Sequence, residues 1–319
     1  MLAENNNKIK VLEEVKKISA NISYAKGVTL VNAKIAFPDE VKINETDTAG
    51  IGEAVALAKK SDVVIMVLGE HGMQSGEGRS RSRLDLPGLQ QQMLEAVYAV
   101  NKNVVLVLMN GRPLAITWAN ENVPAILEAW QPGIQSGDAI AQILFGEYNP
   151  SGKLPMTFPR SVGQVPIYYN HYSTGRPGPK TEVFWSHYTD ETNKPLYPFG
   201  YGLSYTKFDY SKLKIDDADP SKIKVSVSVK NSGKLSGEEI VQLYIRDMTA
   251  SIVRPVKELK GFQKIKLDAG EVKQVDFLLT GAELGFYNSK GEFIVEPGVF
   301  KIMVGTNSEK GITGQFTKK

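Results

Sequence analysis

DVVIMVL (residues 62–68) and NVVLVLM (residues 103–109) are two continuously apolar runs, and they decide the fold of the first half of the chain. Such runs are typical of parallel strands that are covered by helices on both faces. A helix-like segment lies between them, LPGLQQQMLEAVYAV (86–100), with Pro87 at a first-turn position. The alternation continues to about residue 146. It predicts an α/β sandwich, a parallel-rich sheet with flanking helices, over residues 1–160.

The C-terminal part of the chain has a different periodicity. IKVSVSVKNSG (223–233), EEIVQLYIRD (238–247) and GVFKIMVG (298–305) alternate apolar and polar residues with period two. This pattern predicts an all-β sandwich of the immunoglobulin or fibronectin III-like kind over residues 206–319. Residues 161–205 are rich in Pro, Gly and aromatic residues without clear periodicity, and we expect an ordered linker there.

The composition excludes several classes of function. The chain has 319 residues, no cysteine and a formal charge of +3 that is not gathered into a basic arm, so we expect no nucleic-acid partner. Three scattered histidines and no thiols predict no metal centre and no cofactor. No apolar run approaches the roughly 18 residues of a membrane span, and the first residues lack the apolar core of a signal peptide. A periplasmic, a secreted and a cytoplasmic protein all remain compatible with the sequence.

The loop GEHGMQSGEGRSRSRLDLPG (69–88) follows the first buried strand and is the strongest candidate for chemistry. Ligands of parallel sheets bind beyond the carboxyl ends of the strands, where this loop begins. Glu77 lies between two glycines, which let the backbone turn sharply and carry a carboxyl to a ligand. Three arginines follow it in the loop, and inward-pointing arginines would lower the pKa of a nearby carboxyl.

The same loop has other interpretations. A solvated surface loop with structural glycines explains the residues equally well. A phosphate-binding loop is disfavoured because neither GxGxxG nor GxxxxGK[ST] is present. A serine hydrolase is disfavoured because the chain has no GxSxG elbow.

Several longer motifs resemble the C-terminal half of family 3 glycoside hydrolases of the β-glucosidase type. They are SGEGRSRSRLDLPG (75–88), VLVLMNGRPLAI (105–116), ILEAWQPGIQSGDAIAQILFGEYNPSGKLPMTFP (126–159) and LYPFGYGLSYTKF (196–208). The tail, with VKNSGKLSGEEIVQLYIRD (229–247) and RPVKELKGFQKIKLDAGE (254–271), resembles the family's fibronectin type III-like domain. The motifs cover most of the chain in the family's order.

The resemblance implies a retaining β-glycosidase in which Glu77 is the acid/base. In the family the nucleophile comes from an N-terminal (β/α)8 barrel, so the resemblance implies no nucleophile in this chain and a barrel partner, in cis or as a separate chain. The expected substrate is a β-linked oligosaccharide or an aryl or alkyl glycoside, and the chain alone is expected to be inactive. Possible supporting or substrate-binding residues are Glu70, His71, Met73, Arg79 and Trp185.

Other residues have two interpretations each. Trp118 and Trp130 lie in helix and strand patterns, where core packing is expected. Trp185 lies in the loop region, where it would line an aglycone site or cover a barrel. Asn110-Gly111-Arg112-Pro113 follows a buried strand and reads as a turn with a structural arginine or as part of a cleft. The competing hypothesis for the whole chain is a non-catalytic carbohydrate-binding or scaffold protein.

Overall fold

The computed structural model describes residues 10–31, 35–36, 39–178, 181 and 183–319. It divides into two compact units. The first, here the α/β unit, comprises Met1–Tyr148 and Pro159–Val165. The second, here the β unit, comprises Asn149–Phe158 and Pro166–Lys319. Within the described residues no helix is long and apolar enough to cross a membrane.

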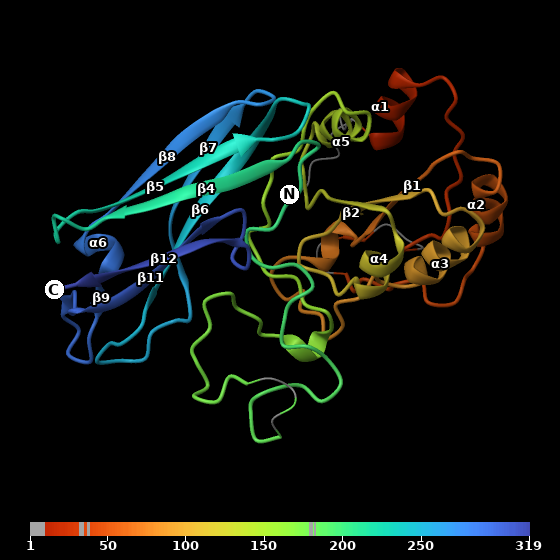
Figure 1. Ribbon diagram of the computed structural model, residues 1–319. Helices are drawn as coiled ribbons and strands as arrows, with labels where there is room; N and C mark the ends of the chain where they lie inside the picture. The colour runs from red at the N-terminus through yellow and green to blue at the C-terminus, as the bar shows by residue number, and fades with distance from the viewer. Residues whose placement is uncertain (1–9, 32–34, 37–38, 179–180, 182) are drawn as a thin grey trace. The chain divides into compact units, whose positions relative to one another are not determined.

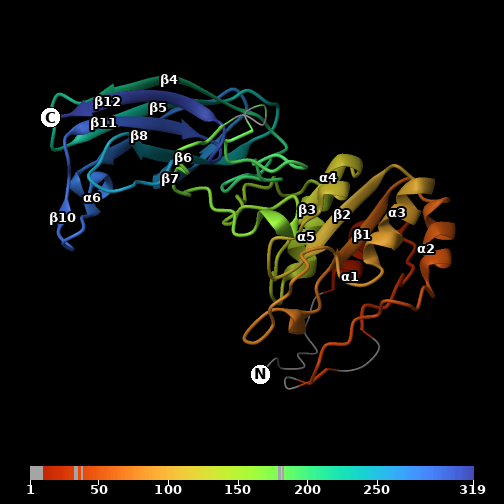
Figure 2. The same ribbon diagram turned by 90° about the horizontal axis from the view of Figure 1, so that it is seen from below.

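A three-stranded parallel sheet in the order β1-β2-β3 forms the centre of the α/β unit (Figures 1 and 2). Its strands are β1 (Val64–Gly69), β2 (Val104–Met109) and β3 (Ala125–Glu128). Helices α2 (Ile51–Ala58) and α3 (Gln90–Val100) pack together on one side of the sheet, and α1 (Val11–Ile18) and α5 (Ser136–Leu144) pack together on the other. α4 (Thr117–Asn122) connects β2 to β3. The parallel sheet that the apolar runs predict is therefore confirmed.

The start of α3 differs from the sequence prediction. Pro87 was expected in the first turn of this helix, but α3 begins at Gln90. The reason is Gly88, whose φ of 65° is left-handed and interrupts helical backbone between the proline and the helix. The side-chain amide of Gln90, through Nε2, donates to the carbonyl of Pro87 at 2.9 Å, so the proline closes the preceding loop.

The β unit is built from two antiparallel sheets. One has the order β4-β5-β8, with β4 (Phe208–Asp216), β5 (Ile223–Asn231) and β8 (Val272–Leu279). The other has the order β12-β11-β6-β7, with β12 (Gly311–Lys318), β11 (Gly298–Gly305), β6 (Gly237–Asp247) and β7 (Glu258–Leu267). A short helix α6 (Gly281–Leu284) and the pair β9 (Phe286–Tyr287) and β10 (Phe293–Ile294) complete it.

The core of the β unit is formed by the inward side chains that the period-two pattern selects. In β5 every second residue is buried, from Ile223 through Val225 and Val227 to Val229, and these residues share one cluster with side chains of β6, β8 and β11. Alternation of this kind places one face of each sheet against the other and leaves the opposite face to solvent. The predicted all-β sandwich is therefore also confirmed.

Candidate active site

The loop between β1 and α3 is fastened at its base by a backbone constraint and a buried amide. Gly69 ends β1 with φ of 146°, and a Cβ there would lie 2.0 Å from the carbonyl oxygen of Met109. Only glycine fits so close to the neighbouring strand. The buried amide of Gln90 accepts from Gly69 N at 2.9 Å and donates to Gly69 O at 2.8 Å. The two ends of the loop are thus held together where β1 stops.

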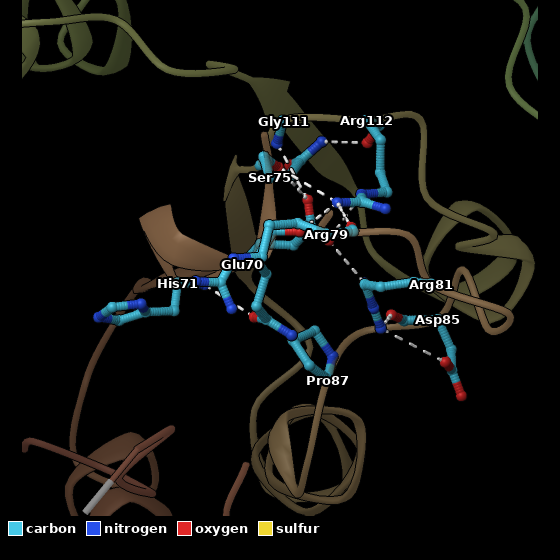
Figure 3. Close-up of polar contacts among 12 residues, drawn as sticks. Glu70, His71, Ser75, Arg79, Arg81, Asp85, Pro87, Gly111 and Arg112 are labelled. Atoms are coloured by element: carbon cyan, nitrogen blue, oxygen red, sulfur yellow. Dashed lines mark hydrogen bonds and ion pairs between the residues drawn. The ribbon is translucent and has the colours of Figure 1, made fainter. Parts of the chain in front are cut away.

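Glu70, the first residue after β1, is a buried carboxylate with two arginine partners (Figure 3). Its side chain is 1% exposed. Arg81 Nη1 lies 2.7 Å and Arg112 Nε 3.0 Å from Glu70 Oε1. Glu70 Oε2 accepts from Gly111 N at 3.0 Å and from the Ser75 hydroxyl at 3.4 Å. Such pairing compensates the cost of burying a charge.

His71 and Met73 shape the loop locally. His71 caps the short 3-10 helix Gly72–Gln74: its Nδ1 accepts from Met73 N at 3.2 Å, and Gln74 Oε1 accepts from His71 N at 2.9 Å. The His71 ring points away from the Glu70 cluster (Figure 3). These contacts give His71 a capping role in this short helix.

Glu77 lies at the tip of the loop, in a turn that Arg79 N closes by donating to Gly76 O at 3.2 Å. Gly76 has φ of 123° and Gly78 has φ of 69°, so both flanking residues adopt backbone that favours glycine. The Glu77 side chain is exposed, and a Cβ at either glycine would meet no atom within 4 Å. The turn therefore exposes the Glu77 carboxyl between two glycines that have free space around them.

The three arginines after Glu77 have partners of their own. Arg79 Nη1 donates to the carbonyl of Asp39 at 3.1 Å. Arg81 pairs with Glu70, as described above, and its Nη2 donates to the carbonyl of Asp85 at 3.0 Å. Arg83 is 78% exposed and pairs with Asp85 at 3.0 Å. Arg81 is thus turned inward, toward Glu70.

Arg112 lies in the turn for which the sequence left two interpretations open, a structural arginine or part of a cleft. Besides its ion pair with Glu70, its Nη2 donates to the carbonyls of Gln74 and, at 3.0 Å, of Arg79, and lies 3.5 Å from Ser75 Oγ. Its sequence signal was the NGRP turn after β2. Carboxyl ends of adjacent parallel strands meet at one edge of a sheet, and the pairing of Gly69 with Met109 places that turn beside the Glu70 loop.

A second buried carboxyl, Glu128, lies at the end of β3. Burial raises the pKa of Glu128 to about 7, opposed by hydrogen bonds from Trp130 N and Asn110 Nδ2 and supported by the negative charge of Glu70. The Trp130 amide donates at 3.0 Å and the Asn110 amide at 3.4 Å. Trp130 itself has φ of 53°, so the strand stops before it. Its expected place in a strand pattern is wrong, because left-handed backbone cannot continue β3.

Trp185 belongs to the β unit and not to the α/β unit that carries Glu77. Its indole packs on Gly178, where a Cβ would lie 2.0 Å from the ring, and its carbonyl lies 2.8 Å from His187 Nδ1. Trp118 lies in α4, with its ring edge-to-face on Tyr98 at 5.6 Å between centroids. Among the residues described, no group of three His, Asp or Glu side chains is arranged to hold a metal ion.

Comparisons with known proteins agree with these features. Residues 2–205 match the glycosyl hydrolase family 3 C-terminal domain, and residues 239–308 match the fibronectin type III-like domain. The periplasmic beta-glucosidase of Salmonella typhimurium is 45% identical over 309 residues, which is 93% of this chain and 40% of that enzyme. A beta-xylosidase of Formosa agariphila is 44% identical over 281 residues, 87% of this chain and 38% of that enzyme.

Solved structures show the same likeness. The beta-glucosidase of Listeria innocua in complex with isofagomine has a TM-score of 0.88 and 38% identity, over 98% of this chain and 42% of that one. A beta-glucosidase of Erythrobacter marinus has a TM-score of 0.87 and 39% identity, over 97% of this chain and 43% of that one. The chain therefore spans about 40% of the length of the relatives it matches.

Proposed function

Because this chain belongs to glycosyl hydrolase family 3, we propose that it is the part of a retaining, exo-acting β-glycosidase that supplies the acid/base, Glu77. The observation that carries the proposal is the placement of Glu77. It is an exposed carboxyl between two glycines of positive φ, on a loop anchored at the carboxyl end of β1. An acid/base group must reach the substrate, and the loop that carries it must be anchored so that the carboxyl is held in position.

The chemistry uses two carboxyl groups. Glu77 donates a proton to the glycosidic oxygen as its bond to the anomeric carbon breaks, while a second carboxylate attacks that carbon from the other face. Glu77, now ionised, then takes a proton from water, whose oxygen attacks the same carbon and releases the second carboxylate. In retaining enzymes the two carboxyl groups are about 5 to 5.5 Å apart.

The second carboxylate is proposed to come from a (β/α)8 barrel, in cis or as a separate chain. Two buried carboxyls near the loop, Glu70 and Glu128, are engaged elsewhere: Glu70 pairs with two arginines, and Glu128 accepts from the Trp130 and Asn110 amides. A barrel, whose active residues lie on its own loops, would supply the nucleophile and most contacts to the terminal sugar. On this proposal the isolated chain binds a β-glycoside weakly, protonates its leaving oxygen poorly and does not hydrolyse it.

The proposed substrate is a terminal β-D-glucosyl or related residue of an oligosaccharide, or an aryl or alkyl glycoside. The similar proteins include both beta-glucosidases and beta-xylosidases, which supports the class of β-glycosides and not one sugar. No cofactor is invoked, because proton transfer and carboxylate attack complete the reaction.

Reconstitution with a barrel of the same family tests the proposal. The pair is expected to hydrolyse 2,4-dinitrophenyl and methyl β-glucosides. Glu77→Ala is expected to lower turnover of the methyl glycoside by about 10² to 10⁴-fold. With the dinitrophenyl substrate, which needs no protonation of its leaving group, azide is expected to restore turnover by replacing water and to give the β-glycosyl azide.

Two outcomes would contradict the proposal. One is a folded, associated pair without activity, which favours the carbohydrate-binding or scaffold alternative. The other is a Glu77→Ala pair that hydrolyses the methyl glucoside as fast as the unsubstituted pair. Arg83→Ala is the matched control, because Arg83 is in the same loop and its side chain is 78% exposed.

A further inference from the structure

We propose that Arg112 is a positioning residue for Glu77: its guanidinium bridges the two ends of the turn that carries the acid/base, and Glu70 holds that guanidinium in place. The inference rests on the proposed role of Glu77 but names residues that act through it. Figure 3 shows Arg112 with Glu70, Ser75, Arg79 and Gly111.

The bridging contacts lie on both sides of the turn. One nitrogen, Arg112 Nη2, donates to the carbonyl of Gln74 and, at 3.0 Å, to the carbonyl of Arg79. These carbonyls flank the segment from Ser75 to Gly78, so a single guanidinium sets the separation of its ends. The hydrogen bond from Arg79 N to Gly76 O, at 3.2 Å, closes the turn between these two carbonyls.

The guanidinium is held from its other side. Arg112 Nε lies 3.0 Å from Glu70 Oε1, and the same oxygen lies 2.7 Å from Arg81 Nη1. Glu70 is 1% exposed and Arg112 21% exposed, so solvent screens this pair only weakly. Gly111 N also donates to Glu70, at 3.0 Å. Both loops are therefore joined through one carboxylate.

Packing pins the base of the turn and leaves its tip open. A Cβ on Gly111 would lie 2.1 Å from Ser75 Oγ, so the loop after β2 lies directly against the first residue of the turn. At Gly76 and Gly78 a Cβ would meet nothing within 4 Å. The tip thus has few contacts of its own, and its position depends on the contacts at its base.

Position matters because an acid/base must reach the leaving oxygen within hydrogen-bonding distance. A displacement of about 1 Å costs on the order of 10²-fold in rate. Lysine at position 112 would keep a positive charge for Glu70 but offers a point charge in place of a planar fork, so it cannot span both carbonyls and the carboxylate. Arg112→Lys is therefore the variant that separates positioning from charge compensation.

The first arm of the test uses the chain alone and does not depend on glycosidase activity. Amide hydrogen exchange is measured residue by residue in the unsubstituted chain, in Arg112→Lys and in the control Arg83→Lys. Arg112→Lys is expected to speed exchange of the Arg79 amide by at least about tenfold and to leave the amides of α3 unchanged. An unchanged Arg79 amide, or equal acceleration in α3, would overturn the proposal, because the second result means a general loss of stability.

The second arm uses the chain paired with a barrel. Arg112→Lys is expected to lower kcat for the methyl β-glucoside by about 10 to 100-fold and for the dinitrophenyl β-glucoside by less than threefold. In a Glu77→Ala background the same substitution is expected to add nothing for the methyl substrate. Equal losses on both substrates, or full additivity, would contradict a positioning role. An inactive unsubstituted pair counts against the proposed function, and the first arm still decides the role of Arg112.

Discussion

Glu239 in the β unit and Glu70 in the α/β unit are both buried against a cation, and the two glutamates differ in what their partners contact. In the β unit, Glu239 lies 3.1 Å from Lys153 Nζ, with side chains 3% and 9% exposed, and accepts from the Tyr210 hydroxyl at 2.8 Å. Burial first, and then the charge of Glu239, raise the pKa of that hydroxyl. In the α/β unit, Glu70 is buried to the same degree against Arg81 and Arg112.

The remaining donors of the cations make the difference. Lys153 also donates to the carbonyl of Gly202 and to the Thr306 hydroxyl, both at 2.9 Å, so it joins segments within the body of the β unit. Arg112 donates to the carbonyls that flank an exposed turn. Burial and pairing of a carboxylate are thus alike in the two places. The other acceptors of the cation decide whether the ion pair stabilises the unit or positions a loop.

Breaking the Glu239 pair is expected to have the largest effect on stability. Glu239→Ala leaves Lys153 buried without its counter-charge, which costs about 3 to 5 kcal/mol. Urea unfolding followed by a probe in the β unit measures this free energy. Lys207→Ala is the control, because the pair of Lys207 with Asp209 at 3.6 Å is exposed and is expected to contribute little to stability. A loss below 1 kcal/mol for Glu239→Ala would contradict the claim that the pair of Glu239 with Lys153 stabilises the β unit.

Glu70→Ala is expected to cost less stability and to change the loop more. The arginines retain carbonyl acceptors and are 15% and 21% exposed, so the expected cost is about 2 to 3 kcal/mol. Hydrogen exchange of the Arg79 amide is expected to rise beyond the change seen in the β-sheet amides. If both variants lose equal stability and the loop exchange follows the global value, the two glutamates have the same role.

Glu128→Gln is expected to remove a pH dependence from the stability of the α/β unit. Because burial raises the pKa of Glu128 to about 7, above its ordinary value, the folded state holds this proton more tightly than the unfolded chain. The α/β unit should therefore lose stability as pH rises from about 4.5 through 7, by about 2 to 3 kcal/mol. Glutamine removes that ionisation, so the variant should gain stability at pH 8 and match the unsubstituted chain at pH 4.5. Urea midpoints at the two pH values measure this, and an equal gain at both would contradict it.

Arg83→Ala is expected to have the smallest effect. Arg83 pairs with Asp85 at 3.0 Å, but its side chain is 78% exposed, so the expected change in stability is close to zero. Thermal unfolding measures it. A larger loss would mean that charge anywhere in this loop, and not the geometry around Glu70, sets its order.

The strands could be predicted from the sequence because burial sets their pattern: parallel strands under helices are apolar at nearly every position, and strands with one buried face alternate. The run at residues 62–68 became β1 almost unchanged, and the alternation at residues 223–233 became β5. Helix ends were harder to predict from the sequence. The position of Pro87 suggested a first turn, but the left-handed Gly88 moved the start of α3 to Gln90. A local conformation of one residue is not visible in a periodicity.

The candidate site shows the same division. Two flanking glycines on a loop that follows a buried strand made Glu77 a reachable carboxyl, and the resemblance to the family implied its role as acid/base, which remains a prediction. Arg112 could not be selected from several arginines, because its contacts depend on which loops lie side by side. Glu128 gave no signal in the sequence, since its apolar neighbours describe a strand and not the partners of its carboxyl.

The sequence by itself determined the two fold classes and the loop at the end of β1, because hydrophobic periodicity and glycine act through the chain's local geometry. Only the tertiary structure decided which arginines neutralise Glu70. The pairing of Gly69 with Met109 in adjacent parallel strands brings the turn after β2 beside the loop after β1. Ion pairs depend on distances of a few ångströms between side chains far apart in the chain, and those distances exist only once the sheet has formed.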